Sequence, residues 1–195
     1  MPIKPNWEER KQKALEILTK KLPILEENND INKVIEYVAN KISVCLNDKG
    51  IKGKVLCVNP ADINYEKISI EYNLAAKGHI IWITFTNSGH VAVVGAGTDI
   101  NFSKSKRYGT WWLIDQLNKN IDWYKESVIV VPIEGLNKES NGIKNVDNVL
   151  KCRNGVEHYI GECLMSFNIP ILNYFSHRNY SERFWLACKQ NDYNL

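Results

Sequence analysis

The chain has 195 residues, of which 44% are apolar and 24% charged, and its formal net charge is +3. This composition is ordinary for one globular domain, and it excludes an intrinsically disordered chain. The mild charge falls short of the concentrated basic face that obligate nucleic-acid binders show. No apolar run is long enough to span a membrane, and the opening segment lacks the apolar core of a signal peptide. We therefore expect a single cytoplasmic domain over residues 1–195 that makes no membrane contact.

The chain contains an odd number of cysteines, and no two of them have the C-x-x-C spacing of a zinc ribbon. A disulfide framework or a structural zinc site is therefore not expected. We predict reduced thiols, no metal site and no cofactor. The five cysteines are Cys45, Cys57, Cys152, Cys163 and Cys188.

Residues 1–50 are predicted to form a pair of amphipathic helices. Asn6 can cap the first helix, with a glutamate three residues later as in a capping box, and Pro23 ends it. Asp30 can cap the second, whose apolar residues recur at helical spacing until Gly50 stops it. The remaining residues, 51–195, are expected to form the sheet core.

The first part of the sheet core reads as an antiparallel meander. Residues 54–58 form a short apolar run, and residues 67–74 alternate in the manner of a half-buried strand. Apolar residues 79–85 and 90–95 flank a polar turn at 86–89, which predicts a hairpin.

The second half alternates between strands and helices. Helices are predicted at 109–118, 146–167 and 180–189, and continuous apolar strands at 127–133 and 169–175. Such alternation favours parallel pairing with right-handed crossovers. The predicted fold is α/β, with a mixed sheet in which the antiparallel meander is followed by β-α-β-α-β-α, preceded by two N-terminal helices.

Three of the predicted strands lead into polar residues. Asp99 follows the strand at 90–95, Glu134 follows 127–133, and His177 follows 169–175. Ligands of open α/β sheets bind beyond the C-terminal ends of parallel strands. We therefore expect Asp99, Glu134 and His177 to meet at one edge as candidate catalytic residues, although Asp99 also suits a turn and Glu134 a solvated loop.

Cationic and polar residues are expected beside that edge. The basic loop at 104–109 leads into a predicted helix, and helix N-termini and cations both favour anions. Arg153 and Glu157 are four residues apart on a helix, so they either form a surface ion pair or face the same edge. The candidate ligand-binding residues are Thr98, Asn101, Lys104, Lys106, Arg107, Tyr108, Arg153 and Glu157.

Several familiar sites are excluded by their motifs. The segment VAVVGAG resembles the start of a dinucleotide fingerprint, but Ile100 stands where the third glycine would be. The chain has no Walker A lysine motif, no nucleophile elbow and no H-E-x-x-H.

The element order over residues 31–189 resembles the cytidine deaminase-like fold. The segment FTNSGHVAVVGAGTDINFSKSKRYGTWW corresponds to that family's hairpin, ligand-contacting loop and first zinc helix, and CRNGVEHYIGEC to its second zinc helix. The resemblance implies a pocket at the edge described above, with Asp99 and Asn101 as ligand contacts.

The zinc signature of that family is missing from this chain. The first helix would open with Tyr108, Gly109 and Thr110. It therefore lacks the pair that this family needs there, a zinc-binding His or Cys followed two residues later by a catalytic Glu. The second offers Cys152 alone, with Gly155 at the place of the second cysteine. Because catalytic zinc needs three protein ligands, the resemblance implies a fold without deaminase activity.

Two functions from different classes remain. The first is binding of a nucleotide-like or phosphorylated small molecule at this edge, with hydrolysis or transfer left open. The alternative is a protein-binding module, such as an immunity or inhibitor protein of a mobile element, because six tryptophans and nine tyrosines supply typical interface anchors. Nucleic-acid binding is a lesser alternative that needs cations and exposed aromatic rings on one face.

Overall fold

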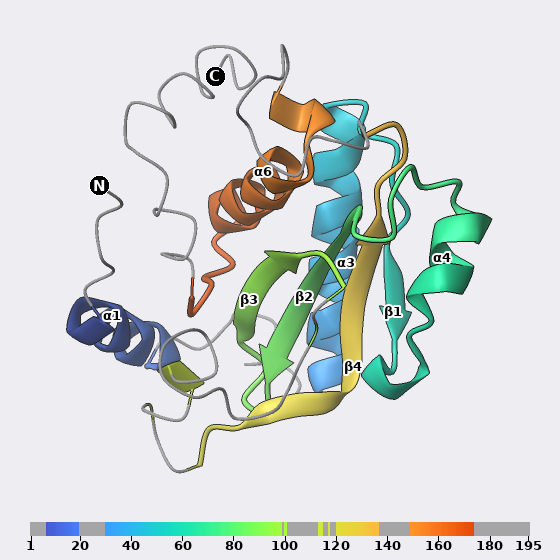
Figure 1. Ribbon diagram of the computed structural model, residues 1–195. Coiled ribbons are helices and arrows are strands. Elements are labelled where there is room, and N and C mark those ends of the chain that lie inside the picture. Colours follow the sequence, from blue (N-terminus) through green and yellow to red (C-terminus); the bar gives the residue numbers. More distant parts are fainter. Residues whose placement is uncertain are drawn as a thin grey trace.

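The computed structural model describes residues 7–19, 30–98, 100, 113–114, 117, 120–136 and 149–173. Its four strands form one antiparallel sheet in the order β1-β4-β2-β3 (Figure 1). The elements are α1 (Trp7–Leu18), α3 (Ile31–Asp48), β1 (Leu56–Val58), the 3-10 turn η1 (Pro60–Asp62), α4 (Tyr65–Glu71), β2 (Ile80–Thr86), β3 (Val91–Ala96), β4 (Trp123–Pro132), the 3-10 turn η2 (Val149–Lys151) and α6 (Arg153–Ser166).

Helix α3 confirms the second predicted helix. The side chain of Asp30 accepts a hydrogen bond from the backbone N–H of Asn32, and thus satisfies one of the donors that a helix start leaves open. Gly50 follows the helix in the left-handed region, at φ 62°, where glycine is favoured. The buried stripe follows the predicted spacing and comprises Val34, Ile35, Val38, Ile42, Cys45 and Leu46.

The hairpin of β2 and β3 also confirms its prediction. Gly89 has a φ of 79° in the turn, and its N–H donates to the carbonyl of Thr86. Alternate residues of β2 point to opposite faces of the sheet. Ile81, Ile83 and Phe85 belong to the large core beneath α3 and α6.

The two faces of the sheet have different covers. Helix α3 runs behind the sheet in Figure 1, and residues of α3 and α6 share one apolar core with β2, β3 and β4. On the other face, α1 packs near β3, whereas α4 packs near β1 and β4. The sheet is therefore a central layer, with its main core on the α3–α6 side.

The expected parallel layout is wrong, since every pairing within the four-stranded sheet is antiparallel. Strand β4 returns to the free side of β2 instead of pairing with β3, and it runs antiparallel to β2. Beyond the sheet, one isolated parallel bridge joins Val91 to Ile171. The alternation of strands and helices did not predict this strand order, because strands pair through contacts between residues that are far apart in the sequence.

The predicted strand at 67–74 is also wrong, because residues Tyr65–Glu71 form helix α4. The side chain of Asn64 caps this helix by accepting from the N–H of Lys67 at 2.9 Å. Tyr65, Ile68 and Leu74 pack against the sheet, whereas Ile70 is 75% exposed. Alternation over a short segment did not distinguish a strand from this capped helical turn.

The cysteines differ from the expected set of reduced thiols. Cys45 of α3 and Cys163 of α6 form a disulfide, although they are 118 residues apart in sequence. Helix packing brings their Cα atoms to 6.2 Å, within the ordinary reach of a disulfide. Cys57 and Cys152 are free thiols, and Cys188 lies outside the described residues. The argument for the cytoplasm from reduced thiols therefore loses its support.

The remaining helices are partly described. Helix α6 confirms the later part of the helix predicted over 146–167, since it begins only at Arg153, after the 3-10 turn η2. Of the predicted helix at 109–118, Leu113 and Ile114 are described as helical, and the helix at 180–189 lies outside the described residues. No described helix is both long and apolar enough to cross a membrane.

Candidate functional site

One end of the sheet gathers several polar groups, and we call it the strand-end edge. Strands β3 and β4 are both antiparallel to β2, so they run in the same direction and end where β2 begins. Ala96 of β3 pairs with Ile81, and Pro132 of β4 pairs with Ile80. Helix α6 also begins at this end, which is the upper end of the sheet in Figure 1.

Arg153, the first residue of α6, contacts the strand-end edge directly. Its Nη1 donates a long hydrogen bond, 3.4 Å, to the carbonyl of Gly78. A Cβ atom at Gly78 would lie 2.9 Å from this nitrogen, and one at Gly97 would lie 3.5 Å away. Gly97 also has a φ of 108°, which side chains disfavour. The two glycines thus leave the space in which the guanidinium lies over the backbone.

His79 follows Gly78 and is completely buried. Its backbone is fixed on both sides, because its N–H donates to Ala76 and its carbonyl accepts from the N–H of Ile133. Neither ring nitrogen has a hydrogen-bond partner among the residues that the structure describes. Burial, and then the positive charge of Arg153, lower the pKa of His79. The imidazole is therefore neutral at neutral pH, with one donor and one acceptor.

Glu157 lies one helical turn after Arg153 on α6. Burial raises the pKa of Glu157 to about 8, and the charge of Arg153 opposes this only in part. The carboxyl group is therefore mostly protonated at neutral pH and can donate a hydrogen bond. Perturbed carboxyl groups of this kind are more frequent at functional sites than on ordinary surfaces.

Together these groups form a small polar site with one fixed cation. Arg153 supplies a permanent positive charge, while His79 and Glu157 supply neutral hydrogen-bonding groups. The N-terminal end of α6 adds a favourable dipole for negative charge. A guanidinium group and a helix N-terminus are both groups that favour anions in proteins.

The predicted site residues are placed only in part. Thr98 and Glu134 follow the ends of β3 and β4, so they lie near the strand-end edge, and both are exposed. The N–H of Glu134 donates to the carbonyl of Lys52 at 2.8 Å, which fixes its backbone only. The other candidates lie outside the described residues, namely Asp99, Asn101, Lys104, Lys106, Arg107, Tyr108 and His177.

Arg153 directs its hydrogen bonds to Gly78 and to the side chain of Asn154. Both Arg153 and Glu157 are partly buried, and Glu157 lies in the electrostatic range of Arg153. That Glu157 faces the strand-end edge stays a prediction.

His79 was not predicted as a site residue, although it stands at the start of the strand predicted over 79–85. A histidine that opens an otherwise apolar strand was the available signal. Its lack of a hydrogen-bond partner within the described residues depends on the tertiary structure.

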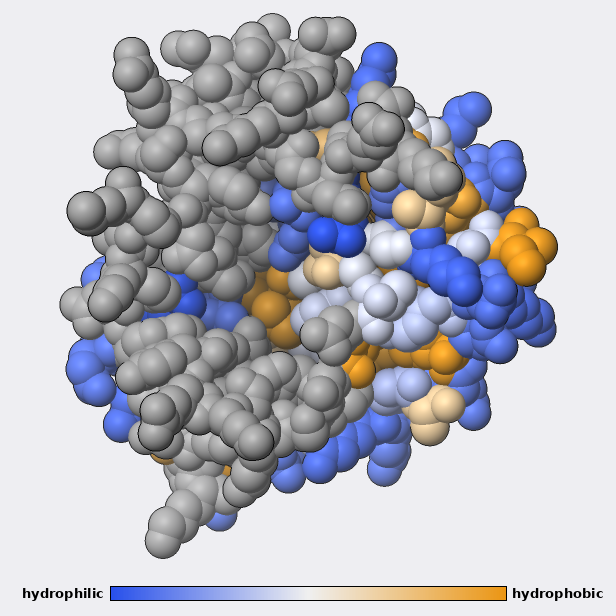
Figure 2. Space-filling view, viewed as in Figure 1, coloured by the Kyte–Doolittle hydropathy of each residue, from blue (hydrophilic) through white to orange (hydrophobic). Residues whose placement is uncertain are grey.

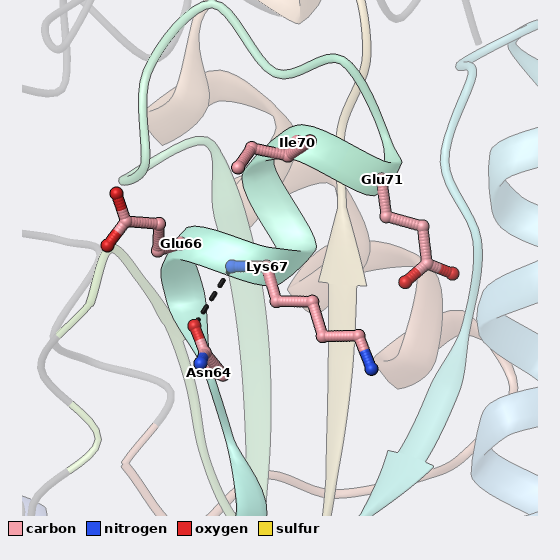
Figure 3. Close-up of a pocket in the computed structure, with 5 residues that line it drawn as sticks. All are labelled: Asn64, Glu66, Lys67, Ile70 and Glu71. Carbon is pink, nitrogen blue, oxygen red and sulfur yellow. Dashed lines mark hydrogen bonds between the residues drawn. The ribbon is translucent and has the colours of Figure 1, made fainter.

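A second hollow, of about 370 Å³, lies on the outer side of α4. Figure 3 shows the carboxylates of Glu66 and Glu71 on opposite sides of this helix, with Lys67 between them. Glu66 pairs with Lys77 at 3.4 Å, and Ile70 is exposed. Figure 2 shows a small hydrophobic group at the right edge of this face, surrounded by hydrophilic residues. All its lining comes from one short element, so it forms a shallow surface and not an enclosed site.

Metal binding has no candidate within the described ranges, where no three His, Cys, Asp or Glu side chains come together. No family model, curated protein or solved structure matches the chain. The resemblance to the cytidine deaminase-like fold thus stays a prediction, and the functional argument depends on the strand-end edge alone.

Proposed function

We propose that the protein binds a small anionic ligand of nucleotide-like or phosphorylated type at the strand-end edge. Arg153 would pair with the anionic group, and the imidazole of His79 would hydrogen-bond to the ligand. The observation that carries this proposal is the completely buried His79 ring, which has no hydrogen-bond partner and lies in the electrostatic range of Arg153.

The energetic reason lies in the cost of such a ring. A buried polar group without a partner costs about 1–3 kcal/mol relative to one that is hydrogen-bonded. An apolar side chain at position 79 would avoid this cost, since Ile80, Ile81 and Ile133 around it are buried and apolar. A ligand atom that accepts or donates at the imidazole would recover it on binding.

The test is a thermal-shift and calorimetric screen of inorganic phosphate, nucleoside monophosphates and sugar phosphates. Wild type should be stabilised by at least one of these anions, as expected when a ligand binds only the folded state. The variants Arg153→Gln and His79→Leu should stay folded and lose about ten-fold or more in affinity, because each lacks one ligand contact.

Lys67→Gln is the matched control, since it removes an exposed cation on α4 that lies outside the edge. This variant should bind like wild type. Equal binding by wild type and Arg153→Gln would contradict the proposal, and so would the absence of stabilisation by every anion in the screen.

Catalysis by Asp99, Glu134 and His177 stays a prediction, as does a role of the protein as an immunity or inhibitor module. For the second role, neither of the two tryptophans with described side chains is fully exposed. Trp82 is partly buried and lies over Gly95, and Trp123 is buried. The large apolar side chains that the structure describes as exposed are Val44 of α3, Ile70 of α4 and Met165 of α6.

A further inference from the structure

The disulfide between Cys45 and Cys163 joins the helix that carries the ligand site to the helix that supports it. Cys45 is completely buried in α3, and Cys163 is partly exposed in α6. Arg153 lies ten residues before Cys163 on α6, which is about 15 Å along the helix axis. The bridge is therefore outside the site but on the same rigid element.

A continuous cluster connects the bridge to the start of α6. Cys45, Cys152 and Tyr159 are buried in one cluster against which Cys163 also packs. The hydroxyl of Tyr159 donates to the carbonyl of Cys45 at 3.0 Å and lies 3.2 Å from the carboxylate of Asp48. Tyr159 thus links α6 to α3 at a point between the bridge and the site.

Cys152 is the cap of α6, and it directly precedes Arg153. Its Sγ accepts a hydrogen bond from the N–H of Gly155 at 3.3 Å. The position of this cap depends on the same cluster as the disulfide. A change in how closely α6 is held to α3 would therefore reach Arg153 through packed side chains.

We propose that this disulfide is a redox switch for the strand-end edge; the inference rests on the ligand-binding function proposed for that edge. A thiolate of a dithiol reductant attacks the Cys163 sulfur, which is the more accessible of the two, and the Cys45 thiolate leaves and takes up a proton. The second thiol of the reductant then displaces Cys163 as a thiol, and the reductant becomes a disulfide.

The remaining contacts keep α6 folded when the bridge opens. Val156, Ile160 and Leu164 are buried in the main core, and the Tyr159 hydrogen bonds do not involve the sulfur atoms. Reduction should thus loosen the start of α6 without unfolding the protein. An oxidising compartment keeps the bridge closed, whereas a reducing one opens it.

The experiment compares oxidised and dithiothreitol-reduced protein in a Cys57→Ser background, which removes the exposed thiol of β1 and keeps the bridge. Hydrogen exchange is measured for the amides of residues 153–160, and the affinity for inorganic phosphate by calorimetry. Reduction should speed exchange there about ten-fold and weaken phosphate binding about five-fold, at the lower end of ordinary couplings between sites. Cys57→Ser/Cys163→Ser should resemble the reduced protein with or without reductant.

Two outcomes overturn the switch. One is unchanged exchange at residues 153–160 when mass spectrometry shows both thiols to be free, and the other is equal phosphate affinity in the two redox states. A different outcome, in which the oxidised protein binds neither phosphate nor any other anion of the screen, overturns the proposed function and with it the regulation of that function. The exchange measurement separates these cases because it needs no ligand.

Discussion

His79 and His90 lie at opposite ends of β2, and both are buried, yet their surroundings differ. The Nδ1 atom of His90 is 3.0 Å from the hydroxyl of Ser88, which is 2.8 Å from the hydroxyl of Thr86. Thr86 in turn accepts from the N–H of His90 at 3.2 Å. His79 has no such network, although its ring is even less exposed.

This difference separates a structural histidine from a candidate functional one. At the hairpin end, the Thr86 hydroxyl accepts from the N–H of His90 and shares a hydrogen bond with Ser88, whose hydroxyl in turn contacts the imidazole. That chain fixes the turn. At the strand-end edge, the His79 ring is buried and makes no hydrogen bond within the described part of the chain, which costs free energy. We infer that the second arrangement is kept for a ligand.

The largest expected effect concerns Glu157, because its buried carboxyl group should make the free energy of unfolding depend on pH. The folded protein holds a proton on Glu157 up to about pH 8, whereas the unfolded chain releases it near pH 4.5. Stability from this group is therefore lost as the pH rises between these values, by up to about 1.4 kcal/mol per pH unit. Glu157→Gln should gain about 4 kcal/mol on wild type between pH 4.5 and 8, as measured by urea unfolding.

Glu71→Gln is the control for this series, since Glu71 is an exposed carboxylate on α4. Its stability should stay within about 0.5 kcal/mol of wild type at each pH. The same pH dependence in wild type and Glu157→Gln would show that the carboxyl group is not protonated in the folded protein.

A smaller effect is expected at the hairpin end. Thr86→Val keeps the shape of the side chain but leaves the N–H of His90 and the hydroxyl of Ser88 without this partner, and it should cost about 1–3 kcal/mol. Thr84→Val is the matched control, because Thr84 is equally buried on β2 and its hydroxyl has no partner. The Thr84 variant should be neutral or slightly stabilised in denaturant unfolding. Equal losses in the two variants would mean that the network does not fix the turn.

The smallest effect is expected for His79→Leu without ligand. Removal of the unpartnered ring should raise stability by about 1 kcal/mol at pH 7. The gain should grow towards pH 5.5, because a lowered histidine pKa makes the wild type lose stability as the pH falls below the ordinary value near 6.5. His90→Leu should instead destabilise the protein. A clear loss of stability in His79→Leu would place this histidine with His90 as a structural residue.

Local structure was largely predictable from sequence. Asp30 and Gly50 bound α3 as expected, and the turn at Gly89 joins β2 to β3. These features depend on caps, turns and periodicity, which act within a few residues. The helix α4 was missed because Ile68 and Leu74 suit a strand as well as a helix, and the cap at Asn64 decides between them.

The candidate site was predictable only as a location. Polar residues were expected where strands end, and Thr98 and Glu134 do follow the ends of β3 and β4. Arg153 was predicted as a residue that could face the same edge, and it donates a hydrogen bond to Gly78 there. His79 was not found, since burial without a partner is a property of the assembled protein.

The sequence by itself determined helix α3, the hairpin of β2 and β3 and the apolar stripe of α3, but not helix α4. Only the tertiary structure decided that β4 lies between β1 and β2, that Cys45 meets Cys163, and that Arg153 lies over Gly78. The physical reason is the distance along the chain over which the deciding contacts act. Hydrogen bonds in helices and turns join near neighbours, whereas strand order, helix packing and disulfide partners depend on contacts between residues far apart in the chain.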